Sequence, residues 1–205
     1  MSDDLVLRCQ AGDPEAFRRL FRRHRDDVAR LVQRMLGPTS DVEDVVQEVF
    51  VQVHRSLDNF RRDSRFSTWL YRVTVNVVLM HRRAARSRPL LAELAEAHVP
   101  RDPRPLPDEE VARRSRIMAF YRLLDRLSNK KRSVYVLHDL EGMPAAEVAR
   151  IVGAPVLTVR TRLFYARREL AALLREEPVL AALADELAPE SARDAPTGAR
   201  KEPVA

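Results

Sequence analysis

Five side chains between residues 160 and 168 have the types and spacing of a surface that reads the edges of DNA bases. Arginine can donate two hydrogen bonds to a guanine, whereas threonine and aromatic side chains can contact a thymine methyl group or the backbone. On a helix these side chains fall on one face, away from an apolar stripe. The chemistry is therefore recognition by contact and not catalysis. The five residues are Arg160, Thr161, Phe164, Tyr165 and Arg168.

A helix-turn-helix over residues 143–170 would position that face. The pattern predicts a short helix over 145–152, a tight turn at Gly153 and a longer helix from about 157 to 175. Ala149 is small where the two helices must cross closely. In such a motif the second helix enters the major groove. A plain helical hairpin with a solvated basic face is the competing interpretation. The expected shared core comprises Val148, Ile151, Val156, Val159 and Leu163.

Charge is distributed unevenly along this chain of 205 residues and net charge +6. Residues 1–88 hold 17 basic and 12 acidic side chains, and residues 113–175 hold 14 basic and 5 acidic. Residues 89–112 hold 2 basic and 6 acidic, and residues 176–205 hold 3 basic and 7 acidic. Two basic blocks separated by an acidic segment indicate two anion-binding modules, with nucleic acid as the leading partner. An arginine-rich composition on solvated faces would produce the same counts.

The first basic block is patterned as amphipathic helix. Asp13 and Pro14 can begin a helix that Gly37-Pro38 ends. The next helix carries a valine-rich apolar stripe and, on its other side, an acidic and amide face. Residues 59–67 hold no long apolar run and are expected to form a loop, before a helix from Thr68 to about Arg86.

The domain boundary is placed where prolines cluster. Residues 88–108 contain five prolines, which prevent regular helix and favour an extended tether. We therefore expect an all-α chain with one helical domain over 1–88, a Pro-rich acidic linker over 89–112 and a second helical domain over 113–175. An acidic, Ala- and Pro-rich tail follows over 176–205 and is expected to be partly disordered.

Several classes of site are not indicated by the sequence. Cys9 stands alone and the five histidines are scattered, which argues against a disulfide within the chain or a zinc cluster. No P-loop or nucleophile–base arrangement is present, so neither catalysis nor a cofactor is expected. No apolar run approaches the ~20 residues of a spanning helix, and the acidic N-terminus is unlike a signal peptide. A cytoplasmic protein without stable membrane insertion is the expectation.

Three stretches of the sequence resemble segments of one protein family. The stretch LLDRLSNKKRSVYVLHDLEGMPAAEVARIVGAPVLTVRTRLFYARREL resembles region 4 of the extracytoplasmic-function (ECF) RNA polymerase sigma factors. Two earlier stretches, DVEDVVQEVFVQVHRSLDNF and FSTWLYRVTVNVVLMHRRAAR, resemble the polymerase-binding helix and the −10 segment of region 2. The resemblance covers roughly residues 5–175. It implies a sigma factor that binds core RNA polymerase, recognises the −10 and −35 promoter elements and promotes DNA melting for transcription initiation.

The resemblance also implies roles for individual side chains. Acidic and amide residues would dock on core polymerase, which involves its beta and beta-prime subunits, whereas Asn76 would read a −10 base beside a pocket wall and nearby arginines would bind phosphates. The polymerase-binding set is Asp41, Asp44, Gln47 and Glu48. The −10 set is Ser56, Phe60, Arg61, Arg62, Arg65, Val73, Asn76, Arg82 and Arg83, with Arg72 and Arg86 as further phosphate contacts. The −35 set is the five residues between 160 and 168.

Three features depart from the family pattern or leave alternatives open. Pro144 stands where relatives usually have a serine or threonine cap, so Glu147 is the candidate to cap that helix instead. Tyr165 replaces a residue that is often basic, which puts the −35 preference in question. Trp69 and Tyr71 suit base stacking, but core packing is the more usual role for such aromatics.

Two other functions compete with the sigma factor interpretation. A helix-turn-helix repressor or activator would bind duplex DNA tightly without polymerase. An anti-sigma-like or scaffold protein would bind polymerase without reading bases. Many members of the family are silenced by an anti-sigma protein, so a partner of that kind is also expected for this chain, with its identity open.

Overall fold

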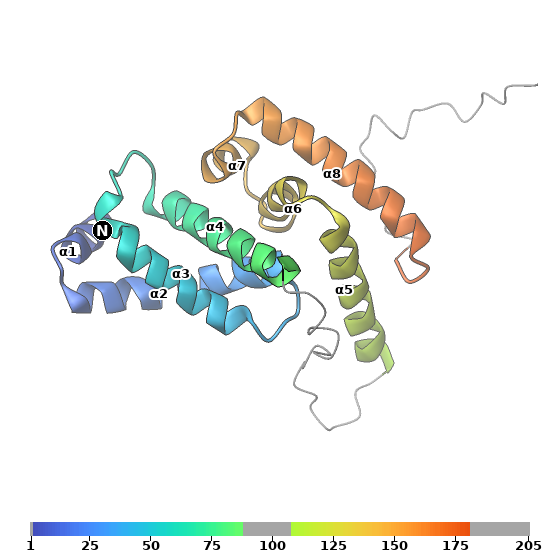
Figure 1. Cartoon of the computed structure of the whole chain (residues 1–205), viewed down its shortest axis with the longest axis horizontal. Coiled ribbons are helices and arrows are strands. Elements are labelled where there is room, and N and C mark those ends of the chain that lie inside the picture. Colours follow the sequence, from blue (N-terminus) through green and yellow to red (C-terminus); the bar gives the residue numbers. More distant parts are fainter. Residues whose placement is uncertain (1, 88–107, 181–205) are drawn as a thin grey trace, which may run out of the picture.

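The structure is a computed structural model that describes residues 2–87 and 108–180, and within that part of the chain every regular element is a helix (Figure 1). The N-terminal half contains α1 (Ser2–Gln10), α2 (Pro14–Leu36), α3 (Val42–Ser56), the 3-10 turn η1 (Leu57–Asn59) and α4 (Phe66–Ser87). The C-terminal half contains α5 (Asp108–Arg126), α6 (Asn129–Tyr135), the short π-helix η2 (Val136–Leu140), α7 (Ala145–Val152) and α8 (Val156–Glu176). The all-α prediction is confirmed.

The ends of α2 lie where local chemistry predicted them. The Asp13 carboxylate accepts hydrogen bonds from the backbone N–H groups of Glu15 and Ala16, at 2.9 and 3.1 Å. These two donors have no partner inside the helix, so the side chain satisfies them at its start. At the other end Gly37 adopts φ +89°, a conformation that side chains with a Cβ rarely adopt, and the helix stops there.

Two helix boundaries differ from the predictions. The helix expected from Thr68 begins two residues earlier, at Phe66. The buried ring of Phe66 packs against Phe60 and Trp69, and this packing holds Phe66 in the first turn of the helix. The helix α5 begins at Asp108, within the residues 89–112 that the sequence assigned to the linker. The remainder of the predicted linker, and the predicted tail beyond residue 180, lie outside the described residues.

The two halves are packed together around a continuous apolar core. The valine stripe of α3 is buried between α2 and α4 from Val45 to Val53, as its spacing predicted, and Val42 at its start is half-buried. The same cluster of buried side chains extends into the C-terminal half through Val136, Val148 and Ile151. A second cluster, built around Leu124, Leu170 and Leu174, joins α5 to α8. In Figure 1 α6 and α7 accordingly lie between α4 and α8.

The half-buried His24 makes the stability of the N-terminal half sensitive to acid. Its ring lies 5.3 Å from that of Phe66, and burial, aided by the charge of Arg23, lowers the pKa of His24. The folded protein therefore favours the neutral imidazole, whereas the unfolded chain binds a proton near pH ~6.5. Stability from this group is complete above that pH and is lost progressively as the pH falls below it.

We expect the variant His24→Gln to lose less thermal stability than the wild type between pH 7.5 and pH 5.5. Thermal unfolding followed by circular dichroism at the two pH values measures the difference. The variant His54→Gln, at an exposed histidine of the same half, is the control and should behave as the wild type does. An acid loss of equal size in the wild type and in His24→Gln would contradict the assignment.

Candidate functional site

The predicted helix-turn-helix is present as α7, a three-residue turn and α8. Gly153 adopts the left-handed conformation, φ 63° and ψ 44°, and its backbone N–H donates to the carbonyl of Ala149. A residue with a Cβ would be strained there, which is why a glycine can end α7 so abruptly. Val148, Ile151 and Val159 are fully buried between the two helices. The turn and these three core residues are therefore as the sequence predicted. Val156 is only partly buried, and Leu163 is buried in the second cluster, with side chains of α5, and not in the core shared with α7.

The five predicted reading residues share the exposed face of α8. Phe164 and Tyr165 are 38% and 49% exposed, large values for aromatic side chains, and their rings meet edge to face at 5.4 Å. Arg160, Thr161 and Arg168 are also exposed, whereas the opposite face is buried. The structure thus brings all five together on a surface that can enter a groove.

A sixth side chain on this face was not foreseen. Leu157 lies in the first turn of α8 and is 74% exposed, so it contributes almost nothing to the core. N-terminal residues of a recognition helix contact base edges, and an apolar side chain there suits a thymine methyl group. The position of Leu157 directly after the turn at Gly153 is the feature of the sequence that could have indicated this role.

A neighbouring arginine of α8 has a structural role. Arg167 donates to both oxygens of Asp139, at 2.9 and 2.6 Å, and this bonding raises the pKa of Arg167. The pair ties α8 to η2 and holds the reading face at a set rotation about the helix axis. Arg168, one residue later, points to solvent.

The start of α7 is not capped as predicted. Pro144 occupies the capping position, and no side chain, that of Glu147 included, bonds the first backbone N–H groups. A proline has no side-chain acceptor, but its ring suits an extended residue before a helix. The helix relies instead on burial of its apolar face, since Val148 and Ile151 are at most 2% exposed.

The acidic face of α3 is exposed as predicted at Asp44, Gln47 and Glu48. Asp41 differs from them, because its carboxylate lies 3.2 Å from the ring of His81 on α4. Asp44, Gln47 and Glu48 are therefore accessible to a partner, whereas the Asp41 carboxylate contacts His81 and helps to hold α3 against α4.

An apolar groove of about 460 Å³ adjoins this acidic face, and the sequence did not indicate it. Gln47 lies at its edge, and Val51, 48% exposed, lies off the buried valine stripe and faces outward. An apolar residue out of register with a helix stripe was the signal that could have revealed it. The other lining residues are Phe17, Phe21, Phe50, His54 and Arg55.

One of the residues predicted to form the wall of a −10 pocket, Phe60, belongs to an aromatic cluster. Phe60 is 6% exposed and its ring lies 5.2 Å from Trp69 and 5.7 Å from Phe66. The other two predicted wall residues, Ser56 and Val73, are half-buried. Trp69 is itself half-buried within this cluster, which fits core packing. Asn76 is exposed on α4, with its amide available to an external partner.

The predicted phosphate-binding arginines differ in how available they are. Arg61, Arg62, Arg65 and Arg83 are exposed. Arg72 is also exposed, but its Nη2 donates to the carbonyl of Arg150 at 2.7 Å. The side chain of Arg86 lies outside the part of the chain that the structure describes. Arg82 is not available in this arrangement, because it is 8% exposed and its Nη1 donates to Asp125 of α5 at 2.7 Å. The sequence could not show this, since residues 82 and 125 are brought together only when the two halves pack.

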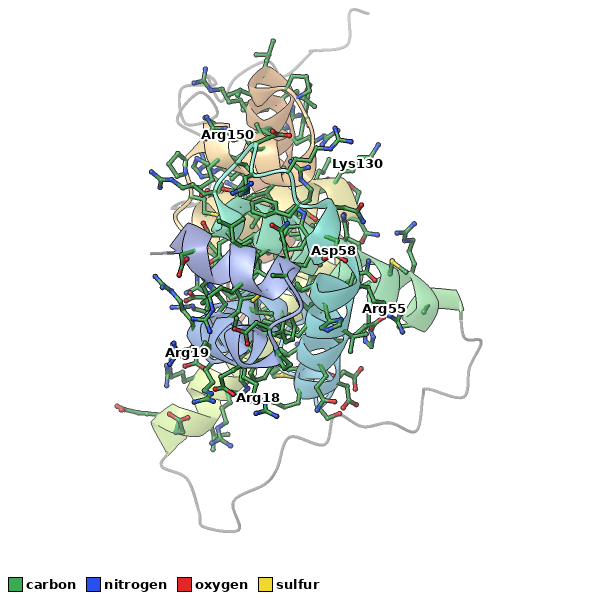
Figure 2. All side chains as sticks on the ribbon, turned by 90° about the vertical axis from the view of Figure 1, so that its left-hand side faces the viewer. Arg18, Arg19, Arg55, Asp58, Lys130 and Arg150 are labelled. Carbon is green, nitrogen blue, oxygen red and sulfur yellow. The ribbon has the colours of Figure 1, made fainter. Side chains whose placement is uncertain are left out.

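Basic side chains lie on two opposite sides of the molecule. In the view of Figure 2, Arg18 and Arg19 of α2 lie on the lower side and Arg150 of α7 lies on the upper side. Within residues 2–87 and 108–180, no group of acidic, histidine or cysteine side chains has the geometry of a metal site. No helix in that part of the chain is both long and apolar enough to traverse a bilayer.

Comparison with known proteins identifies both halves. Residues 20–88 match the family model "Sigma-70 region 2", and residues 117–170 match "Sigma-70, region 4". The chain is 36% identical over 173 residues to the ECF RNA polymerase sigma-E factor of Escherichia coli K12, covering 81% of this chain and 90% of that protein. It is 37% identical over 172 residues to the sigma-E factor of Haemophilus influenzae, covering 80% and 89%.

A solved structure agrees in fold over most of the chain. CnrH, in complex with the cytosolic domain of CnrY, superposes with a TM-score of 0.62 at 29% identity, covering 84% of this chain and 96% of CnrH. The two matched family models lie in this chain in the order region 2, then region 4. The chain belongs to the sigma-70 family and is an RNA polymerase sigma factor of the ECF type, which recognises promoters for transcription initiation.

Proposed function

We propose that the chain divides promoter recognition between its halves. Residues 1–88 bind core RNA polymerase and the −10 element, and residues 113–175 bind the −35 element, with residues 89–112 as the connection. The observation that carries the proposal is the separation of two exposed faces of opposite charge, one on α3 and one on α8. An acidic face repels DNA and suits a basic protein surface, whereas a basic face suits the major groove.

Core polymerase docks on α3. Asp44, Gln47 and Glu48 supply charge complementarity and hydrogen bonds, and the groove beside Val51 supplies apolar area for a partner side chain. Charged contacts of this kind mainly raise the association rate, and a desolvated apolar contact slows dissociation. The combination suits a subunit that must bind polymerase tightly and still exchange.

The −10 element is read as an opened single strand on α4. A base that leaves the stack needs a polar reader for its edge and an apolar or aromatic wall for its face. Asn76 is the exposed reader, Phe60 with Ser56 and Val73 forms the wall, and Arg61, Arg62, Arg65 and Arg83 bind phosphates. Capture of such bases is the means by which the chain promotes melting.

The −35 element is read as duplex by α8. Arg160, Thr161 and Arg168 supply hydrogen bonds, and Phe164, Tyr165 and Leu157 supply apolar contacts to base methyl groups or sugars. The polymerase provides the catalytic chemistry, so this chain acts by binding alone, in the cytoplasm and without a cofactor. CnrH was solved with the cytosolic domain of CnrY, and a protein of anti-sigma type is the corresponding partner proposed here.

The function is tested by reconstitution with core RNA polymerase on a library of genomic promoter fragments. The wild-type chain should give promoter-dependent transcripts, and Asn76→Ala should reduce them about 5–30-fold, because one base-edge hydrogen bond is worth roughly 1–2 kcal/mol. On promoters in which the base read by Asn76 has been changed, Asn76→Ala should cause a smaller reduction in transcripts. The control is Gln33→Ala, an exposed amide on α2. The absence of transcripts from every fragment, or tight duplex binding without polymerase, would sink the proposal.

Reversing a charge on α3 should weaken polymerase binding. We expect Glu48→Lys to lower the affinity for core polymerase about tenfold at low salt, with a smaller loss at high salt because exposed charges are screened. Biolayer interferometry at a low and a high salt concentration measures the affinity for core polymerase in each case. Asp26→Lys makes the same charge change at a carboxylate that is 91% exposed on α2 and should leave binding unchanged. Equal losses in the two variants would mean that only the net charge matters.

Truncating one arginine of the reading face should relax −35 selection. We expect Arg160→Ala to reduce holoenzyme activity about 5–150-fold on a preferred −35 sequence, which corresponds to the ~1–3 kcal/mol of a bidentate base contact. Selection from a randomised −35 library should lose its preference at one position. Arg116→Ala removes the same charge from an exposed site on α5 and should retain the preference. An unchanged preference in Arg160→Ala would refute the assigned contact.

A further inference from the structure

The segment between α3 and α4 carries much of the proposed −10 surface and has little regular structure of its own. We call residues 57–65 the −10 loop: its first three residues form η1, and residues 60–65 follow without a helix or strand. Phe60, Arg61, Arg62 and Arg65 lie on it. A loop that presents such side chains must be held in one shape if it is to bind one strand sequence better than another.

The backbone of the −10 loop includes a strained residue. Arg62 has φ +62°, and within residues 2–87 and 108–180 it is the one residue other than glycine in the left-handed region. A residue with a Cβ adopts that conformation at a cost, so the conformation persists only where the surrounding structure enforces it. The strain therefore indicates that contacts from outside the loop fix its path.

Gln10 of α1 supplies contacts of that kind. Its Nε2 donates to the carbonyl of Leu57 at 2.9 Å and to that of Phe60 at 3.1 Å, which lie 47 and 50 residues later in the sequence. The backbone N–H of Phe60 also donates to the carbonyl of Leu57, at 3.0 Å. One side-chain amide thus spans η1 and fixes the backbone that carries the Phe60 ring.

The amide of Gln10 is itself held in place, because the end of α1 is bound to the start of α2. Arg8 donates from Nε and Nη2 to Oδ2 of Asp13, at 3.0 and 2.6 Å, while Oδ1 of Asp13 caps α2. Val6, one turn before Gln10, is 1% exposed in the N-terminal core. Helix α1 is therefore a fixed support for the −10 loop.

The amide bridges a place where side chains do not fill the space between elements. A cavity of about 230 Å³ lies between the end of α1, the start of α2 and η1, and Gln10 lines it together with Phe17, His54 and Leu57. Packing is incomplete here, so the two hydrogen bonds of Gln10 set the distance between α1 and η1. An apolar side chain of the same length would fit this place without holding the loop.

We propose that Gln10 is a positioning residue for −10 recognition. From α1 it holds the carbonyls of Leu57 and Phe60, which places the Phe60 ring and the arginines after it where the opened strand binds. Gln10 lies outside the match to region 2, which begins at residue 20. This inference rests on the proposed function, and it extends the determinants of −10 selection to a helix that precedes the matched region.

The role is tested with Gln10→Met, which keeps the length of the side chain and removes its donors. Holoenzyme with the full-length chain is titrated with a fluorescent single strand that carries the preferred −10 sequence, and with strands changed at each −10 base in turn. We expect the preference for the first strand to fall at least about fivefold in the variant, since two hydrogen bonds to the loop are lost. The affinities for core polymerase and for a −35 duplex should be unchanged, whereas a general loss of folding would lower all three.

The single tryptophan of the chain reports on the position of the loop. The ring of Trp69 lies 5.2 Å from that of Phe60, so movement of the loop changes the surroundings of the indole. In the free full-length chain, acrylamide should quench Trp69 fluorescence more strongly in Gln10→Met than in the wild type. The matched control Gln33→Met removes an exposed amide in the last turn of α2, and it should equal the wild type in quenching and in base preference.

Two further variants separate the hydrogen bonds from the bulk of the side chain. Gln10→Glu keeps the shape but sets an acceptor against two carbonyls, so the base preference should fall at least as far as in Gln10→Met. Gln10→Lys restores a donor of similar reach and should recover most of the wild-type preference. Circular dichroism verifies that each variant is folded. Should Gln10→Met not fold, Arg8→Gln weakens the same support at an exposed ion pair and should lower the base preference in the same direction.

The outcomes distinguish this role from the function on which it rests. A base preference that is equal in the wild type, Gln10→Met and Gln10→Glu would overturn the role of Gln10 and leave the proposed function intact. A loss that core binding and −35 binding share, or a Gln10→Lys variant as impaired as Gln10→Met, would do the same. A wild-type holoenzyme that does not distinguish the −10 strands would instead overturn the proposed −10 reading, and the role of Gln10 with it.

Discussion

A guanidinium group that leaves water must replace the hydrogen bonds it gives up, and much of this structure follows from how Arg132 does so. This side chain of α6 donates to the carbonyl of Met35, near the end of α2, and to the carboxylate of Asp125 on α5. Because one of those partners belongs to each half, the group can be buried only when the halves pack together. The shared core, the position of α7 against α4 and the occupation of Arg82 are all consistent with that single requirement.

The surfaces that this packing leaves exposed are the ones suited to macromolecular partners. The acidic residues of α3 and the reading residues of α8 have no place in either core, and both are exposed in the structure. Charge keeps their partners distinct, since phosphates are repelled from the first and attracted to the second. The apolar groove beside Val51 and the exposed Leu157 add contact area that charge patterning alone does not indicate.

Local features were predictable because their causes lie within a few residues. The cap at Asp13, the stop at Gly37 and the turn at Gly153 each depend on a side chain and the backbone next to it. The predictions that differed needed distant information. The helix expected from Thr68 begins earlier because Phe66 is buried by Phe60 and Trp69. The predicted cap at Glu147 does not form, and burial of the apolar face of α7 stabilises that helix in its place.

The sequence by itself determined the helical fold class, the order of the helices, the helix-turn-helix and the five side chains on its reading face. Periodicity and turn chemistry act over about ten residues, so they can be read along the chain. Only the tertiary structure decided how the halves meet, that Arg82 is bonded to Asp125 and that Leu157 is exposed. Those facts depend on which surfaces exclude water from each other, and residues 35, 82, 125 and 132 become neighbours only after folding.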